Sequence, residues 1–157
     1  MPTVSFWWKP GCATNTRQIG LLREAGCEVV VRDLLTEPWT TSALSAFFGT
    51  RPVREWFNPA APAVEAGTLV PAEFSAETAL SRLVAEPVLI RRPLIELAGE
   101  RCCGFDAVWL VQRGVRLPDG AVPQGCSHAT SAAEVAECKP PRNPAVYCAP
   151  PSGASFP

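Results

Sequence analysis

The chain has 157 residues and a formal net charge of −1, a length that allows one domain with an appendage. This charge balance gives no reason to expect nucleic acid or an anionic membrane surface as a partner, and no apolar run reaches the roughly 20 residues of a membrane span. The N-terminus lacks the basic region and long apolar stretch of a secretory signal. We therefore expect a cytoplasmic protein.

The seven cysteines are irregularly spaced, and the only histidine is His128. No two cysteines stand in C-x-x-C spacing, which argues against a zinc ribbon and against a dithiol redox motif. A Cys/His catalytic dyad would depend on His128, which lies in a stretch without clear periodicity. We therefore expect no metal site and no such dyad.

The first thirty residues predict a β-α-β unit. Residues 3–8 are rich in Val, Phe and Trp and predict a buried strand, and residues 13–25 predict a helix that stops at Gly26. Residues 28–32 predict a second strand. Such a unit implies two parallel strands joined by a right-handed crossover.

A run of helices is predicted next. Residues 40–48 predict a helix closed by a glycine, and residues 51–57 predict another short helix. Residues 58–71 are rich in proline and alanine and predict a loop. Ser75 can cap a helix that runs to about residue 86.

The next segment predicts a β-β-α ending. Residues 86–97 predict two short apolar strands around an Arg-Arg-Pro junction, and Gly99 predicts the turn of a hairpin. Residues 105–113 predict a closing helix. The order β-α-β, helices, then β-β-α describes an α/β protein with a thioredoxin-like mixed sheet and a helical insertion.

The composition changes near Leu117, because eight of the seventeen prolines lie at position 118 or later and clear periodicity vanishes there. We therefore divide the chain into a folded domain, 1–117, and a proline-rich C-terminal tail, 118–157, which we expect to be disordered. A partner-binding segment and an extension produced by a changed reading frame are alternative interpretations of the tail.

The candidate reactive group is Cys12. It follows the strand at residues 3–8 and the Pro10-Gly11 turn, and it stands where the first helix begins. Backbone N–H groups and the helix dipole favour an anion at such a position, which favours the thiolate. The residues that follow, Ala13, Thr14 and Asn15, would hold an oxyanion beside the sulfur.

Residues 3–113 resemble the arsenate reductase family that uses glutathione and glutaredoxin, which also includes the Spx-type regulators. The turn Lys9–Cys12 and the segments Glu55–Asn58 and Leu89–Leu94 carry the resemblance. Within that family the chain is most similar to the nitrogenase-associated proteins, which share the segments Arg32–Trp39 and Cys103–Asp106. The C-terminal tail lies outside the resemblance.

The resemblance implies that Cys12 is the nucleophile and that Arg92 and Asn58 border the oxyanion. The family places three arginines around the oxyanion; Arg92 matches one, and Asn58 and Gly104 stand at the other two positions. Trp8 replaces the family's histidine. Guanidinium groups offset the charge of arsenate by charge-assisted hydrogen bonds, so these replacements weaken the case for arsenate reduction.

Pro93 resembles the cis-proline that faces the active cysteine in thioredoxin-like folds, where it would present a strand edge to glutathione. In an extended segment Arg91 points away from Arg92, so we place it outside the site. Cys102 and Cys103 are expected to be packed thiols, with a resolving role as the alternative.

The resemblance implies monothiol redox chemistry, or glutathione or oxyanion binding, at Cys12 in a protein linked to nitrogen fixation. Glutathione would be a co-substrate, no cofactor would be bound, and glutaredoxin or a nitrogenase-related protein would be the partner of a monomeric chain. One alternative is a non-enzymatic binding or regulatory module with a degraded site. Another is a glutaredoxin-dependent arsenate reductase.

Overall fold

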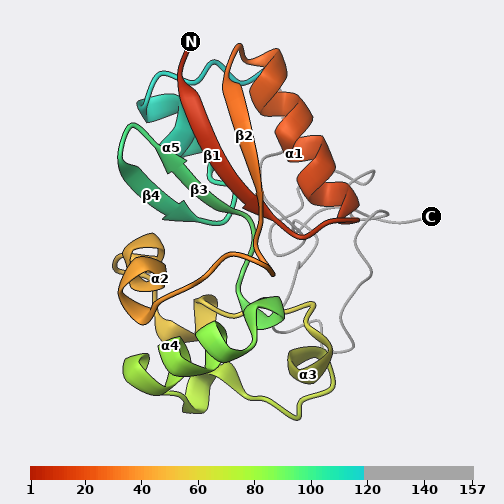
Figure 1. Ribbon diagram of the computed structural model, residues 1–157, viewed down its shortest axis with the longest axis vertical. Coiled ribbons are helices and arrows are strands. Elements are labelled where there is room, and N and C mark those ends of the chain that lie inside the picture. The colour runs from red at the N-terminus through yellow and green to blue at the C-terminus, as the bar shows by residue number, and fades with distance from the viewer. Residues whose placement is uncertain (119–157) are drawn as a thin grey trace, which may run out of the picture.

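A four-stranded mixed sheet forms the centre of the computed structural model, which describes residues 1–118 (Figure 1). The strands lie in the order β2-β1-β3-β4. Their bounds are Thr3–Trp8 for β1, Glu28–Asp33 for β2, Leu94–Leu97 for β3 and Glu100–Cys103 for β4. β1 is parallel to β2 and antiparallel to β3, which forms a hairpin with β4. The predicted β-α-β unit and hairpin are confirmed.

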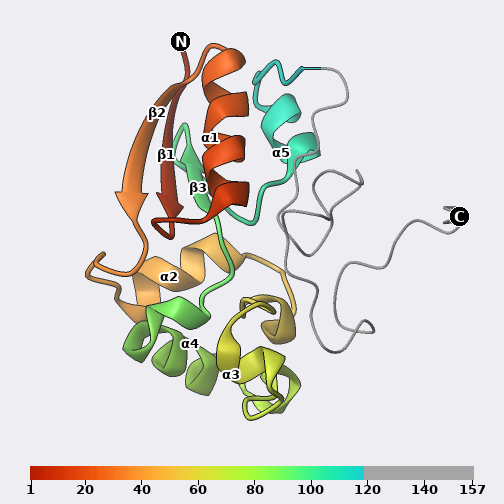
Figure 2. The same cartoon turned by 90° about the vertical axis from the view of Figure 1, so that its right-hand side faces the viewer.

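Helices α1 (Ala13–Glu24) and α5 (Ala107–Gln112) lie on the same side of the sheet (Figure 2). Alternate strand residues point to one face of a sheet, and the residues of β1 and β3 that face these helices are apolar. The buried members of this cluster are Val4, Phe6, Ile19, Leu22, Cys27, Ile95, Leu97, Phe105, Leu110 and Val115. The predicted first and closing helices are therefore confirmed, and they bury one face of the sheet.

The helical insertion between β2 and β3 lies at one end of the sheet (Figure 1). It contains α2 (Thr41–Phe48), α3 (Pro62–Glu65) and α4 (Ala76–Ala85). The hydroxyls of Thr40 and Ser75 accept backbone N–H bonds at the starts of α2 and α4, which satisfies donors that a helix start otherwise leaves unpaired. The predicted cap at Ser75 is confirmed.

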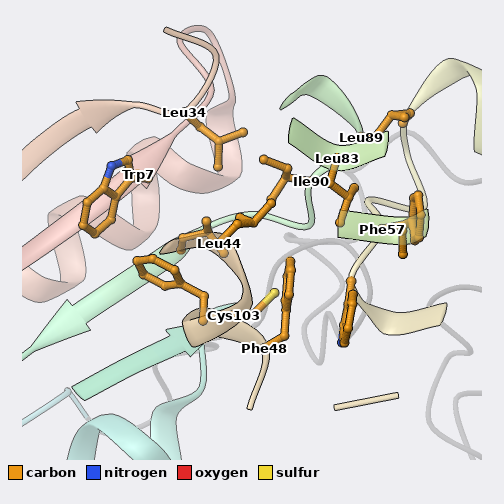
Figure 3. Packing of buried hydrophobic residues seen from close by; sticks show 14 of the residues in the cluster. Trp7, Leu34, Leu44, Phe48, Phe57, Leu83, Leu89, Ile90 and Cys103 are labelled. Atoms are coloured by element: carbon orange, nitrogen blue, oxygen red, sulfur yellow. The ribbon is translucent and has the colours of Figure 1, made fainter. Parts of the chain in front are cut away.

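A second apolar cluster joins the insertion to the sheet (Figure 3). Trp7, Leu94 and Cys103 enter it from three different strands. In the insertion, the Phe48 and Trp56 rings stack with centroids 4.6 Å apart. The insertion is thus packed on the sheet through its own apolar core.

Two predictions for the insertion are wrong. Residues 58–71 contain the short helix α3, where a loop was predicted. The first strand predicted within 86–97 is a 3-10 turn at Pro87–Leu89, and Ile90 forms only an isolated bridge with Phe57. Pro87 has no N–H to give to a ladder, and proline suits the first position of a helical turn.

The predicted helix at 51–57 is reduced to a 3-10 turn at Val53–Glu55, preceded by Pro52. The structure describes residues 1–118, so the C-terminal tail predicted from the sequence lies outside the described residues from position 119 onward. Within residues 1–118, no helix combines the length and the apolar character needed to cross a bilayer.

Candidate functional site

Cys12 occupies the turn between β1 and α1. Gly11 has a φ of +81°, a value that L side chains rarely adopt, and the Cys12 N–H then donates to the Lys9 carbonyl at 3.1 Å. Cys12 is the N-cap of α1, and its carbonyl accepts the Thr16 N–H at 3.0 Å. The Cys12 side chain makes no capping hydrogen bond to this helix. The thiol therefore stands at a helix start that it does not itself cap.

The first turn of α1 buries polar side chains beside Cys12. Thr14 and Asn15 are 4% and 1% exposed, and Gln18 is fully buried. The Asn15 side-chain amide donates to Gln18 Oε1 at 3.0 Å, and its Oδ1 lies 3.5 Å from the Lys9 backbone nitrogen. Asn15 thus ties the turn to the helix, while Ala13 is exposed.

The segment that leads into β3 lies at the same end of the sheet as the Cys12 turn, because Trp7 of β1 opposes Leu94 of β3. The Arg92–Pro93 peptide bond is cis, so that prediction is confirmed. Pro93 is buried and its carbonyl accepts the Gly104 N–H at 2.7 Å, whereas Arg92 is half-buried. Strand pairing thus sets Pro93 next to the end of β1.

Arg91 is buried at the junction between the insertion and the sheet. Its backbone N–H donates to the Trp56 carbonyl at 2.8 Å, and its carbonyl accepts the Cys103 thiol at 3.7 Å. A Cβ built on Gly104 would lie 3.6 Å from Arg91 Nε. The guanidinium of Arg91 therefore borders Gly104, one of the positions that the resemblance assigns to an arginine. The alternation of side chains in an extended segment placed Arg91 outside the site and did not predict that it is buried.

Asn58 is 7% exposed, and hydrogen bonds of its backbone and of its side-chain oxygen fix its position. Its N–H donates to the Leu89 carbonyl at 2.7 Å, and its Oδ1 accepts the Ala60 N–H at 3.1 Å. Within residues 1–118, the buried Nδ2 has no hydrogen-bond partner. A buried donor without a partner is costly, so Asn58 retains the capacity to donate to a ligand or water.

The four described cysteines differ in their access to solvent. Cys27, Cys102 and Cys103 are buried, whereas Cys12 is half-buried. Burial raises the pKa of Cys27 and Cys102, and it raises that of Cys103 to about 12 against the attraction of the Arg91 charge. Of the described thiols, Cys12 is therefore the one placed to react. Cys102 and Cys103 are packed, as expected.

Among residues 1–118, no group of three or more His, Cys, Asp or Glu side chains is placed to hold a metal ion.

The chain has a thioredoxin-like fold that is similar to the fold of solved arsenate reductase proteins. An ArsC family related protein from Bacteroides fragilis superposes with a TM-score of 0.62 at 21% identity, covering 71% of this chain and 98% of that one. Arsenate reductase from Vibrio cholerae gives a TM-score of 0.56 at 20% identity, covering 66% and 90%. At these identities the likeness concerns the fold.

No family model matches the sequence. The chain is 44% identical over 106 residues to the uncharacterized 15.7 kDa protein in the draG 3′ region of Rhodospirillum rubrum, an alignment that covers 68% of this chain and 74% of that protein. The chain belongs to the same protein family as this Rhodospirillum rubrum protein.

Proposed function

We propose that the chain is a cytoplasmic monothiol redox protein in which Cys12 forms a mixed disulfide with glutathione, and that it acts in nitrogen fixation. The position of Cys12 carries the proposal: it is half-buried, it begins α1, and it lies at the end of the sheet where Pro93 leads into β3. The link to nitrogen fixation draws its support from the segments Arg32–Trp39 and Cys103–Asp106, which resemble those of the nitrogenase-associated proteins.

The proposed reaction is thiol–disulfide exchange. The Cys12 thiolate attacks one sulfur of oxidised glutathione, the S–S bond breaks, and one glutathione leaves as a thiolate that takes a proton from water. A second thiol, from glutathione or glutaredoxin, then attacks the glutathione sulfur of the mixed disulfide. Cys12 returns as a thiolate, and the incoming thiol ends in a new disulfide with that glutathione, so each step exchanges one disulfide for another. The burial of Cys102 and Cys103 favours an external resolving thiol.

Arsenate reduction is less well supported than glutathione chemistry. Asn58 offers a neutral donor and Gly104 offers no side chain, whereas arsenate carries about two negative charges near pH 7. Losing one donor at an oxyanion site typically costs about 10²-fold in rate. We therefore expect kcat/KM with arsenate, glutathione and glutaredoxin to lie at least about 10²-fold below that of the Vibrio cholerae arsenate reductase assayed beside it. Comparable values would support the arsenate reductase alternative.

A binding or regulatory module without catalysis is the second candidate, and the replacement of two expected arginines by Asn58 and Gly104 favours it. The two candidates differ in their need for the Cys12 thiol. We expect a strain with the gene deleted to grow more slowly on dinitrogen and to be rescued by the wild-type chain but not by Cys12→Ser. Cys27→Ser is the matched control and should rescue. Full rescue by Cys12→Ser would favour the binding module.

A further inference from the structure

Strand β2 lies at an edge of the sheet that residues 1–118 form. Among residues 1–118 it pairs only with β1, through all six of its residues in continuous register. Edge strands usually carry charged side chains, proline or a bulge that hinders further pairing. Glu28–Asp33 has no proline, lysine or bulge, and its charged residues Glu28, Arg32 and Asp33 are of both signs. Val30 and Val31 at its centre are 38% and 36% exposed. The strand is therefore suited to pair with another strand.

The backbone of β2 determines which residues can make that pairing. The N–H groups of Glu28 and Leu34, at and just beyond the two ends of β2, donate to the Pro2 and Trp8 carbonyls. Because backbone groups alternate in direction along a parallel strand, the even-numbered residues bond to β1. Val29, Val31 and Asp33 then direct their N–H and C=O groups outward.

The side chains of β2 alternate between the two faces of the sheet. Val29 packs with the cluster beneath α1, and Arg32 lies over the Trp7 ring at 5.5 Å on the opposite face. Glu28 and Val30 share that opposite face with Arg32 because they are separated from it by even numbers of residues. A glutamate and an arginine therefore flank Val30 symmetrically, two residues to each side.

We propose that β2 pairs antiparallel with β2 of a second copy of this chain, centred on Val30. In this register Val29 and the partner's Val31 exchange backbone hydrogen bonds, as their outward N–H and C=O groups require. Val30 then opposes Val30 of the partner, and Glu28 opposes the partner's Arg32 on both sides of the two-fold axis. Opposite charges at directly facing positions stabilise a strand pair.

Other registers fit less well. A shift by one residue would place the odd-numbered residues, whose N–H and C=O groups point outward, opposite the partner's even-numbered residues, whose groups bond to β1. The hydrogen bonds between the two strands could then not form. A shift by two residues would keep the hydrogen bonds but separate Glu28 from the partner's Arg32. The Arg32 side chain is 48% exposed and its Glu37 contact is loose, at 3.9 Å, so it is accessible to a partner. The two sheets would form one continuous sheet, in place of the monomer expected from the sequence.

Sedimentation of the full chain over a range of concentrations tests the pairing. The wild type should shift from the 16.8 kDa chain toward twice that mass as concentration rises. Glu28→Arg alone and Arg32→Glu alone should each remain monomeric, because like charges would then face each other. Mixing the two single variants, or combining both changes in one chain, should restore the dimer. Arg54→Glu, an exposed charge reversal in the insertion, should leave the dimer unchanged.

A wild type that stays monomeric at all concentrations would overturn the proposal, as would a dimer that both single variants retain. A second measurement does not depend on charge. Val30→Cys should form a disulfide-linked dimer on oxidation with diamide, with the bridge mapped between the two introduced cysteines, because these residues face each other at the axis. Val31→Cys, which should face Val29 of the partner, is the matched control. Bridging that is equal in both variants, or absent in Val30→Cys, would contradict the register.

Discussion

The substitution Phe57→Ala is expected to lower the free energy of unfolding by about 3–5 kcal/mol. Phe57 is 2% exposed, its ring centroid lies 5.3 Å from that of Phe74, and it bridges to Ile90 in the segment that leads into β3 (Figure 3). Removing the ring leaves a cavity within the insertion core and loses apolar burial. Since small domains are stable by only about 5–15 kcal/mol, this loss is a large fraction of the total.

Denaturant unfolding followed by far-UV circular dichroism measures this loss. The matched control is Val108→Ala on α5, whose side chain is 66% exposed and whose truncation should change stability by less than about 0.5 kcal/mol. Equal effects of the two substitutions would contradict the assignment of Phe57 to the core.

Alkaline destabilisation by the buried Cys103 thiol is the second large effect that we expect. Burial raises its folded-state pKa to about 12 from an ordinary value of 9.0. Below pH 9 the thiol is protonated in both states and adds no pH dependence. Between 9 and 12 the unfolded chain loses this proton while the folded chain keeps it, so stability falls as pH rises, by up to about 1.4 kcal/mol per pH unit.

The Cys103→Ala variant isolates this contribution. Its baseline stability will differ because a small cavity replaces the sulfur, but its stability should fall less steeply above pH 9. Cys27, Cys102 and the basic residues titrate in both the wild type and the variant. Their contributions therefore cancel when the unfolding free energy of one protein is subtracted from that of the other at each pH. Unfolding free energies of both proteins measured between pH 9 and 12 would show this smaller loss of stability. Parallel pH profiles for the two proteins would refute the contribution of Cys103.

Local patterns predicted most of the fold. The β-α-β unit, α2, α4 and the β3–β4 hairpin each carry their own periodicity, cap or glycine, so their formation could be predicted without knowing their neighbours. The strand predicted before Arg91 failed because apolar composition does not distinguish a strand from a buried turn. There, Pro87 at the start of the turn decided the conformation.

Contacts between distant segments explain what the sequence did not predict at the site. The Cys12 turn and the cis bond at Pro93 follow from local sequence and from the resemblance. The burial of Arg91 depends on its bond to Trp56 and on the absence of a side chain at Gly104. These residues lie far apart in the chain, and no periodicity joins them. The exposed side of β2 likewise depends on the strand order.

The most direct test of Cys12 as the redox centre is to incubate the reduced full-length protein with oxidised glutathione and map the adducts by mass spectrometry. We predict a glutathione adduct on Cys12 while Cys27, Cys102 and Cys103 remain unmodified in the folded protein, since those three thiols are buried. Excess reduced glutathione should remove the adduct. An unmodified Cys12 under conditions that modify one of the buried cysteines would contradict the proposal.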